Sequence, residues 1–153
     1  SNLNLSFCNL VRANLSGAVL HGANLEGTIM QGANLEGANL EGANLSNAQL
    51  IDTNFLGTNL SGVKFSHSSL TYANLIQVNL TNADLSSTDL RSADLFDSNL
   101  LSANLEGASL INANLFDAKL TCLKGCPLDL PENYICESDL DCEEQDRFRI
   151  VEE

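Results

Sequence analysis

A large apolar residue recurs at every fifth position of this chain from Leu5 to Leu120, and 21 of these 24 positions hold leucine. The residue two places before each of them is usually small, with alanine in 14 of the 24 units. The residue between the two is asparagine in 14 units and aspartate in three. This period is neither the 3.6 residues of a helix nor the plain alternation of a strand.

Each five-residue unit divides into a short extended segment and a corner. In the extended segment the small residue and the leucine point inward, and the polar residue between them points outward. The next two residues make room for a turn, and nine of the ten glycines occupy the second of these positions, where a turn benefits from glycine's freedom. A chain that turns every five residues must coil, and its coils would stack at the strand spacing of about 4.8 Å.

The outward residue that follows each large apolar position indicates the number of sides per coil. Eight of these 24 residues are apolar, and four of them follow one another at intervals of twenty: Leu56, Ile76, Phe96 and Phe116. Val11, Ile51 and Ile111 share a second series with the same interval, and Leu101 is the eighth residue. Four sides of five residues make twenty, so the clustering favours a four-sided coil.

The segment "ANLEGANLEGANLSNAQL", residues 33–50, resembles the pentapeptide-repeat family, whose motif is A-(D/N)-L-x-x. The resemblance implies an all-β fold: a right-handed quadrilateral parallel β-helix, or solenoid, of about six coils with the Leu and Ala positions inside. We expect two parts, the pentapeptide-repeat β-helix over residues 3–122 and an acidic, cysteine-containing C-terminal cap or tail over residues 123–153.

The tail departs from the repeat. Pro127 and Pro131 lack backbone donors and should end regular ladder pairing. Leu130, Ile135 and Leu140 keep the five-residue register, so a distorted extra coil is one interpretation. The end of the chain fits either a short strand in "DRFRIVEE" or a capping helix in "DLDCEEQDRFRIV". Either element would shield the open backbone edge of the coil.

Four cysteines, Cys122, Cys126, Cys136 and Cys142, gather in the tail, whereas Cys8 takes an inward slot and is expected to be a core residue. Two disulfides, free thiols or one zinc site fit the cluster, and two disulfides would leave three connectivities open. "CPLDLPENYIC" resembles Cys-Pro-x-x-Leu-Pro linkers of some bacterial family members, which implies a Cys126–Cys136 pair with Cys122–Cys142 nested around it. Disulfides would predict a periplasmic, lumenal or secreted location, and free thiols a cytoplasmic one.

No Ser/His/Asp or Cys/His arrangement suggests catalysis, no His-rich cluster suggests a metal site, and nothing indicates a cofactor. His21 and His67 fall on different sides and levels of the expected coil. Asp97 and Asp117 should stack about 5 Å apart, as solvated carboxylates or around a cation. The net charge of −13 argues against direct nucleic-acid binding and fits a basic partner, and no apolar run is long enough to span a membrane.

The remaining candidate site is an interface, since contiguous apolar patches mark contact surfaces. It comprises the column Leu56, Ile76, Phe96 and Phe116, with Leu101 and Ile111 beside it. The column would contact a protein partner or a second subunit in a homodimer, or the tail would cover it with Phe148, Ile150 and Val151. We therefore expect a non-catalytic structural or protein–protein interaction module that presents a flat-sided surface. The resemblance supplies an alternative, an acidic DNA mimic that binds DNA gyrase or another DNA-binding protein, although outward acids are sparse along the coil.

Overall fold

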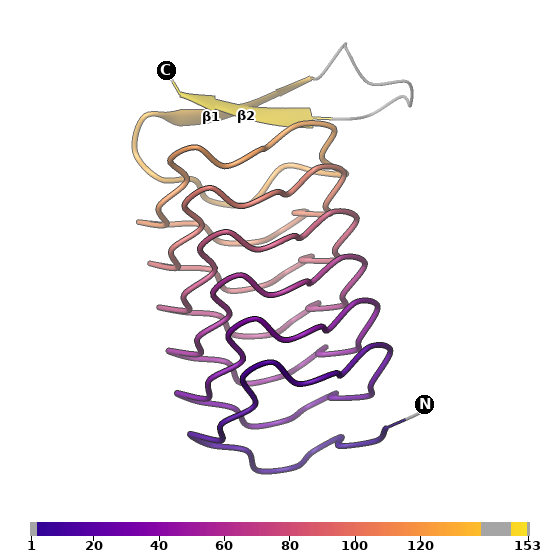
Figure 1. The fold of residues 1–153 in the computed structure, drawn as a ribbon. Helices are drawn as coiled ribbons and strands as arrows, with labels where there is room; N and C mark the ends of the chain where they lie inside the picture. The colour runs from indigo at the N-terminus through magenta and orange to yellow at the C-terminus, as the bar shows by residue number, and fades with distance from the viewer. Residues whose placement is uncertain (1–2, 139–147, 153) are drawn as a thin grey trace.

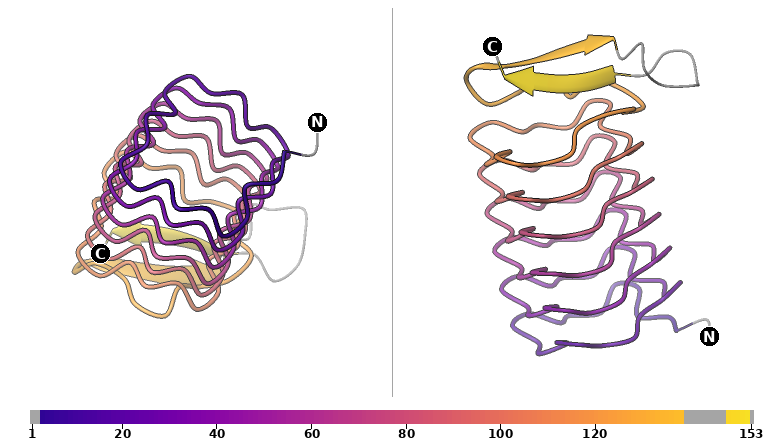
Figure 2. Two further views of the ribbon diagram at one scale, coloured as in Figure 1. Left: turned by 90° about the horizontal axis from the view of Figure 1, so that it is seen from below. Right: turned by 45° about the horizontal axis from the view of Figure 1, so that its top comes forward.

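The computed structural model of the chain describes residues 3–138 and 148–152. The chain winds into a coil in which every side contributes one residue to a parallel ladder (Figure 1). Ladder partners lie 20 residues apart, from Asn4 and Asn24 at one end to Ser109 and Asp129 at the other. Each coil therefore has four sides of five residues, and Figure 2 shows these sides stacked in register.

The backbone hydrogen bonds of one unit explain why its residue types repeat. In the unit around Leu25, the amides of Leu25 and Gly27 donate to carbonyls of the next coil at 2.7 and 2.9 Å. The amide of Thr28 closes the turn on the Leu25 carbonyl at 3.2 Å. The amide of Glu26 instead donates to the side-chain Oδ1 of Asn24 at 3.2 Å. Asparagine or aspartate before leucine thus supplies the acceptor that the backbone cannot provide.

The second corner residue has a positive φ in all 24 units, from residue 7 to residue 122. Nine of these residues are glycines, with φ between 62° and 70°, and the glycine positions of the sequence pattern are thereby explained. The other fifteen, such as Tyr72 at 60° and Asp97 at 52°, carry side chains. Each such residue costs about 1–2 kcal/mol in backbone strain, which the ladder bonds on both sides offset.

Inward leucines and small residues fill the interior as one continuous hydrophobic core. Most large side chains of the middle coils are fully buried, and Phe55 packs edge-to-face on Phe65 across the interior with ring centroids 5.9 Å apart. The first coil is less covered, since Leu5, Leu10 and Leu15 pack against the core only partly buried. Cys8, which the pattern places in the core, is half-buried for the same reason.

The chain ends in an antiparallel hairpin of β1, Tyr134–Ser138, and β2, Phe148–Glu152. The hairpin lies across the C-terminal end of the coil (Figure 1). The amide of Ile150 donates to the Leu120 carbonyl at 3.1 Å, and the Ile150 side chain is buried. Residues 148–152 thus form a strand and not the alternative capping helix, while Leu140 lies outside the described residues.

The two prolines interrupt the ladder less abruptly than we expected. Beyond Pro127 the Leu110 amide still donates to the Asp129 carbonyl at 2.9 Å, so pairing continues on that side until just before Pro131. Leu123 is fully buried. It occupies the position of the small inward residue of the repeat, two residues before the next leucine position. The first part of the tail therefore forms a distorted continuation of the coil.

Candidate functional site

The four predicted column residues occupy consecutive rungs at one corner of the coil, because the ladder joins residues 20 apart. We call Leu56, Ile76, Phe96 and Phe116 the apolar corner. The first three are half-buried. Phe116 is the last rung and is 62% exposed.

The backbone of the apolar corner is held by the repeat itself. Each of its four amides donates, at 3.1 Å, to the Oδ1 of the residue two places earlier: Asn54, Asn74, Asp94 and Asn114. These acceptors are also linked between coils, since Asn74 donates to Asn54 at 3.0 Å and Asn114 donates to Asp94 at 2.9 Å. The backbone that carries the apolar side chains is therefore already ordered, which lowers the entropic cost of binding a partner.

Phe96 and Phe116 stack on each other, with ring centroids 6.0 Å apart and planes inclined by 7°. This separation corresponds to an offset stack, the favoured arrangement for two nearly parallel rings. Phe96 covers one face of Phe116, and the exposure of Phe116 leaves much of the remaining ring open. A pair of ordered aromatic rings at the surface is typical of protein contact sites.

Carboxylates border the two rings. Asp97 and Asp117 follow the phenylalanines directly, and both are exposed. The Nε2 of Gln77, one rung earlier, donates to Asp97 Oδ2 at 3.2 Å. The apolar corner is therefore an aromatic surface with an acidic edge.

The described part of the tail leaves Phe116 largely open. Of the three tail residues considered as a cover, Ile150 is buried with the core at the end of the coil, and Val151 is half-buried on β2. The side chain of Phe148 lies outside the described residues. The hairpin packs against the core at the end of the coil through Ile150 of β2 and through Tyr134 and Cys136 of β1.

Leu101 and Ile111 do not join the apolar corner. With five residues per side, Leu101 lies at the next corner after Phe96, and Ile111 lies at the corner before Phe116. They are 40% and 39% exposed. Ile111 lines a shallow hollow of about 430 Å³ with Tyr72 and Arg91, and a similar hollow of about 330 Å³ lies farther along the same corner. The six predicted residues thus divide among three corners.

Several exposed apolar residues fall outside the prediction. Phe7, Val19, Tyr72 and Leu128 are between 64% and 81% exposed. Phe7 and Tyr72 occupy the second corner position, and Val19 replaces the outward asparagine of the repeat. A search of every outward position, in place of the first corner position alone, would have found these three residues in the sequence.

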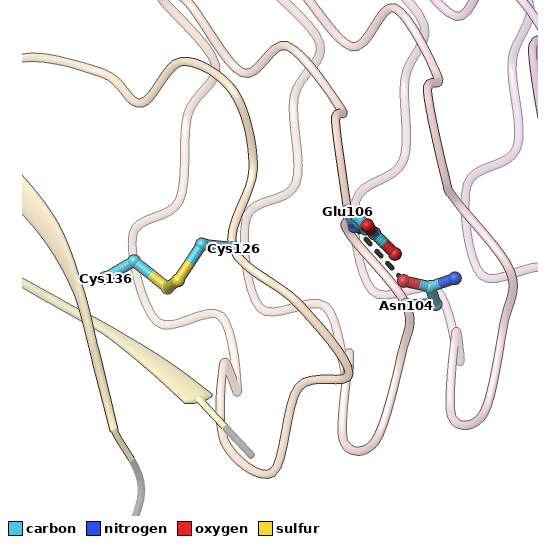
Figure 3. The surroundings of a disulfide bond; sticks show 4 residues. All are labelled: Asn104, Glu106, Cys126 and Cys136. Atoms are coloured by element: carbon cyan, nitrogen blue, oxygen red, sulfur yellow. Dashed lines mark hydrogen bonds between the residues drawn. A yellow bond between two sulfur atoms is a disulfide. The ribbon is translucent and has the colours of Figure 1, made fainter. Parts of the chain in front are cut away.

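The structure contains the Cys126–Cys136 disulfide that the resemblance implied, and Figure 3 shows it joining the loop after the coil to β1. The Cα atoms of the pair are 5.9 Å apart. Cys122 is also disulfide-bonded. Its predicted partner, Cys142, lies outside the described residues, so that pairing stays a prediction.

Other chemistry is limited in the described part of the chain. His21 and His67 lie at different corners, and no three metal-ligating side chains come together within residues 3–138 and 148–152. Arg91 donates to both carboxylate oxygens of Asp89, at 2.8 and 2.6 Å, and these hydrogen bonds lower the pKa of Asp89. No helix among these residues has the length and apolar character needed to cross a membrane.

Comparisons with known proteins agree with this geometry. The family description for pentapeptide repeats, in eight copies, matches residues 1–37, 28–66, 58–95 and 89–121. HetL from the cyanobacterium Nostoc sp. strain PCC 7120, a pentapeptide repeat protein involved in heterocyst differentiation regulation, is 33% identical, with a TM-score of 0.34. The similarity covers 80% of this chain but 63% of HetL, so this chain spans less than two thirds of that protein.

Two further solved structures extend the comparison. The pentapeptide repeat protein alr5209 from Nostoc PCC 7120 is 32% identical over 61% of this chain and 70% of its own, with a TM-score of 0.32. Full-length QnrB1, a plasmid-mediated fluoroquinolone resistance protein, is 16% identical over 78% of this chain and 68% of its own. Its TM-score of 0.54 shows a likeness of fold alone. A search of curated protein sequences gave no match.

Proposed function

We propose that this chain, which belongs to the pentapeptide-repeat family, is a non-catalytic protein–protein interaction module. Proteins of this family form right-handed β-helices. In this proposal the described β-helix is a quadrilateral solenoid of about six coils, the hairpin is its C-terminal cap, and the coil serves as a scaffold. The contact surface is the apolar corner, and Leu101 and Ile111 would extend it to the two neighbouring corners.

The observation that carries this proposal is the ordered pair of phenylalanines on a fixed backbone. Phe96 and Phe116 stack at the surface, and Phe116 remains 62% exposed. The hydrogen bonds from Phe96 to Asp94 and from Phe116 to Asn114 fix both backbones. Exposed apolar rungs do not help the core, so their recurrence along one corner supports a contact role.

The double variant Phe96→Asp with Phe116→Asp tests this function. It should abolish self-association or partner binding, because it places two charges in the apolar contact while leaving the interior unchanged. Light scattering and the retention of partner proteins on the immobilised chain provide the measurements. The matched control, Ser66→Asp with Ser86→Asp, adds the same charges on two consecutive rungs of the opposite corner and should behave as wild type. Equal behaviour of the two double variants would refute the proposal.

An acidic DNA mimic is the second candidate. The net charge of −13 and the fold likeness to QnrB1 support it. The outward ladder residues argue against this candidate: they are neutral asparagine in 14 units and aspartate in only three. The four lateral faces of the coil therefore present mainly amide groups. A supercoiling assay with DNA gyrase tests this candidate: inhibition or protection of the enzyme by the purified chain would place the mimic ahead of the interaction module.

A further inference from the structure

The charges around the apolar corner are almost all of one sign. Among the described residues of this corner and of the two sides that meet there, Glu36, Asp94, Asp97 and Asp117 carry negative charge, and Lys119 carries the one positive charge. Asp97 and Asp117 are exposed beside the stacked rings. A partner that buried this surface would have to provide positive charge next to apolar side chains.

The spacing of the rungs restricts the shape of that partner. Consecutive rungs of a parallel ladder lie about 4.8 Å apart, so the four residues of the apolar corner span about 14 Å. An α-helix advances about 5.4 Å per turn and presents side chains at i, i+4 and i+7 along one stripe. An extended strand repeats on one face only every ~6.7 Å. A helix laid along the corner therefore stays in register with the rungs for about three turns, whereas a strand loses register after one rung.

We propose that the apolar corner binds a basic amphipathic helix of another protein, an inference that rests on the proposed interaction function. Apolar residues of the helix would contact Leu56, Ile76 and Phe96 in turn. An arginine beside them would lie against the open face of Phe116 within reach of Asp117. This geometry combines a cation–π contact with a charge-assisted hydrogen bond.

A second copy of this chain fits the same surface less well. A parallel pairing through the apolar corner would place Asp97 and Asp117 against the same residues of the other copy. An antiparallel pairing of the four rungs would place Asp97 opposite Gln77 and Asp117 opposite Gly57, where no cation lies. Like charges brought together without a counter-charge oppose association.

A synthetic helix provides the probe for binding. It has about fifteen residues, with leucine along one stripe and arginine or lysine on both flanks. One control peptide replaces every basic residue with glutamate, and a second keeps the composition but distributes the leucines around the helix. Fluorescence anisotropy of the labelled peptides, titrated with protein at two salt concentrations, measures affinity. The basic amphipathic helix should bind, and both controls should bind at least about tenfold more weakly.

Variants of the protein separate this site from general attraction between opposite charges. Phe116→Asp should weaken binding of the basic helix about tenfold, and Phe116→Leu should retain most of it. Asp97→Asn with Asp117→Asn should weaken binding about three- to tenfold and reduce its salt dependence. Glu26→Gln with Glu41→Gln removes the same number of charges at other corners and should leave affinity unchanged. Equal losses in the two charge variants, or wild-type affinity in Phe116→Asp, would overturn the inference.

The oligomeric state distinguishes this inference from the proposed function. Wild-type protein should be monomeric by light scattering. If Phe96→Asp with Phe116→Asp disrupts a dimer while affinity for the basic helix is unchanged, the apolar corner is a self-association surface. The proposed function would then stand, and the inference of a basic helix as partner would fail. If oligomeric state, retention of partner proteins and peptide affinity all stay unchanged in this double variant, both proposals fail.

Discussion

The inward hydroxyl groups differ from unit to unit in whether they form a hydrogen bond. Thr53, Thr58 and Thr88 each donate to the carbonyl of a core residue in the preceding coil at 2.9 Å. Ser68 and Ser98 occupy equivalent inward slots and are buried, but their Oγ atoms have no hydrogen-bond partner within the described structure. A buried polar group without a partner costs about 1–3 kcal/mol.

Replacing these serines should stabilise the protein. We expect Ser68→Ala and Ser98→Ala each to raise the free energy of unfolding by about 1 kcal/mol, because alanine already fills most of the small inward positions. Thr58→Ala, which removes a bonded hydroxyl, should lower it by a similar amount. Urea unfolding followed by circular dichroism measures all three. A loss of stability in both serine variants would show that their hydroxyls are satisfied in solution.

At the scale of the structural element, the ladder of Asn and Asp side chains joins successive coils as well as closing each turn. Asn74 shows both roles: its Oδ1 accepts from the Ile76 amide at 3.1 Å, and its Nδ2 donates to Asn54 at 3.0 Å. An aspartate can perform the first role but not the second, since a carboxylate only accepts hydrogen bonds. This difference explains why asparagine is favoured over aspartate in the ladder.

Removing one ladder side chain should therefore cost two hydrogen bonds. We expect Asn74→Ala to lower the free energy of unfolding by about 1–3 kcal/mol. Asn14→Ala, in the first coil, should cost less, because Asn14 is exposed and the hydrogen bond that its Oδ1 accepts from the Ser16 amide is open to water. Chemical unfolding of both variants provides the comparison, and equal losses would mean that the link between coils contributes nothing.

The terminal hairpin depends on a covalent link as well as on packing. A two-stranded hairpin is at best marginally stable alone, and β1 is attached to the loop after the coil through Cys126–Cys136. The loop that this disulfide closes has a sequence separation of 10. Constraining such a loop contributes roughly 2–3 kcal/mol to the stability of the closed form.

Cys126→Ser with Cys136→Ser should loosen the hairpin while the coil remains folded. The local probe is the Ile150 amide, which donates to the Leu120 carbonyl and should exchange with solvent about 30- to 150-fold faster in the variant. Cys8→Ser, at the free cysteine in the first coil, should leave the exchange of Ile150 unchanged. Unchanged exchange in the double variant would show that packing alone holds β2 in place.

At the scale of the whole molecule, the two ends of the coil differ. The hairpin lies over the C-terminal end (Figure 1). The described first coil has Leu5, Leu10 and Leu15 only partly buried, whereas Leu35, Leu60 and other leucines of the middle coils have no exposed surface. Because each coil contacts only its neighbours, stability should follow these local differences.

Hydrogen exchange should reveal this gradient. Amides of the first coil, such as Leu10, should exchange fastest within the ladder, and those of the middle coils, such as Leu60, should exchange most slowly. Substitutions should follow the same order: Leu60→Ala should cost about 2–5 kcal/mol and Leu10→Ala clearly less. Uniform protection from end to end would indicate that the coil unfolds as a single unit.

The strict five-residue period is enough to predict the coil and its inward positions, because it specifies both the turn and the face of every residue. The four sides follow from a second signal, the outward apolar residues that recur every twenty positions. It also placed Phe96 and Phe116 on consecutive rungs. That the described tail leaves Phe116 largely open follows from the tertiary structure, since the direction of the tail depends on contacts such as the one between Ile150 and Leu120, which no repeat specifies. The parallel stack of the two rings and the half-buried state of Cys8 likewise depend on neighbours 20 residues away or at an open end, which a local pattern does not specify.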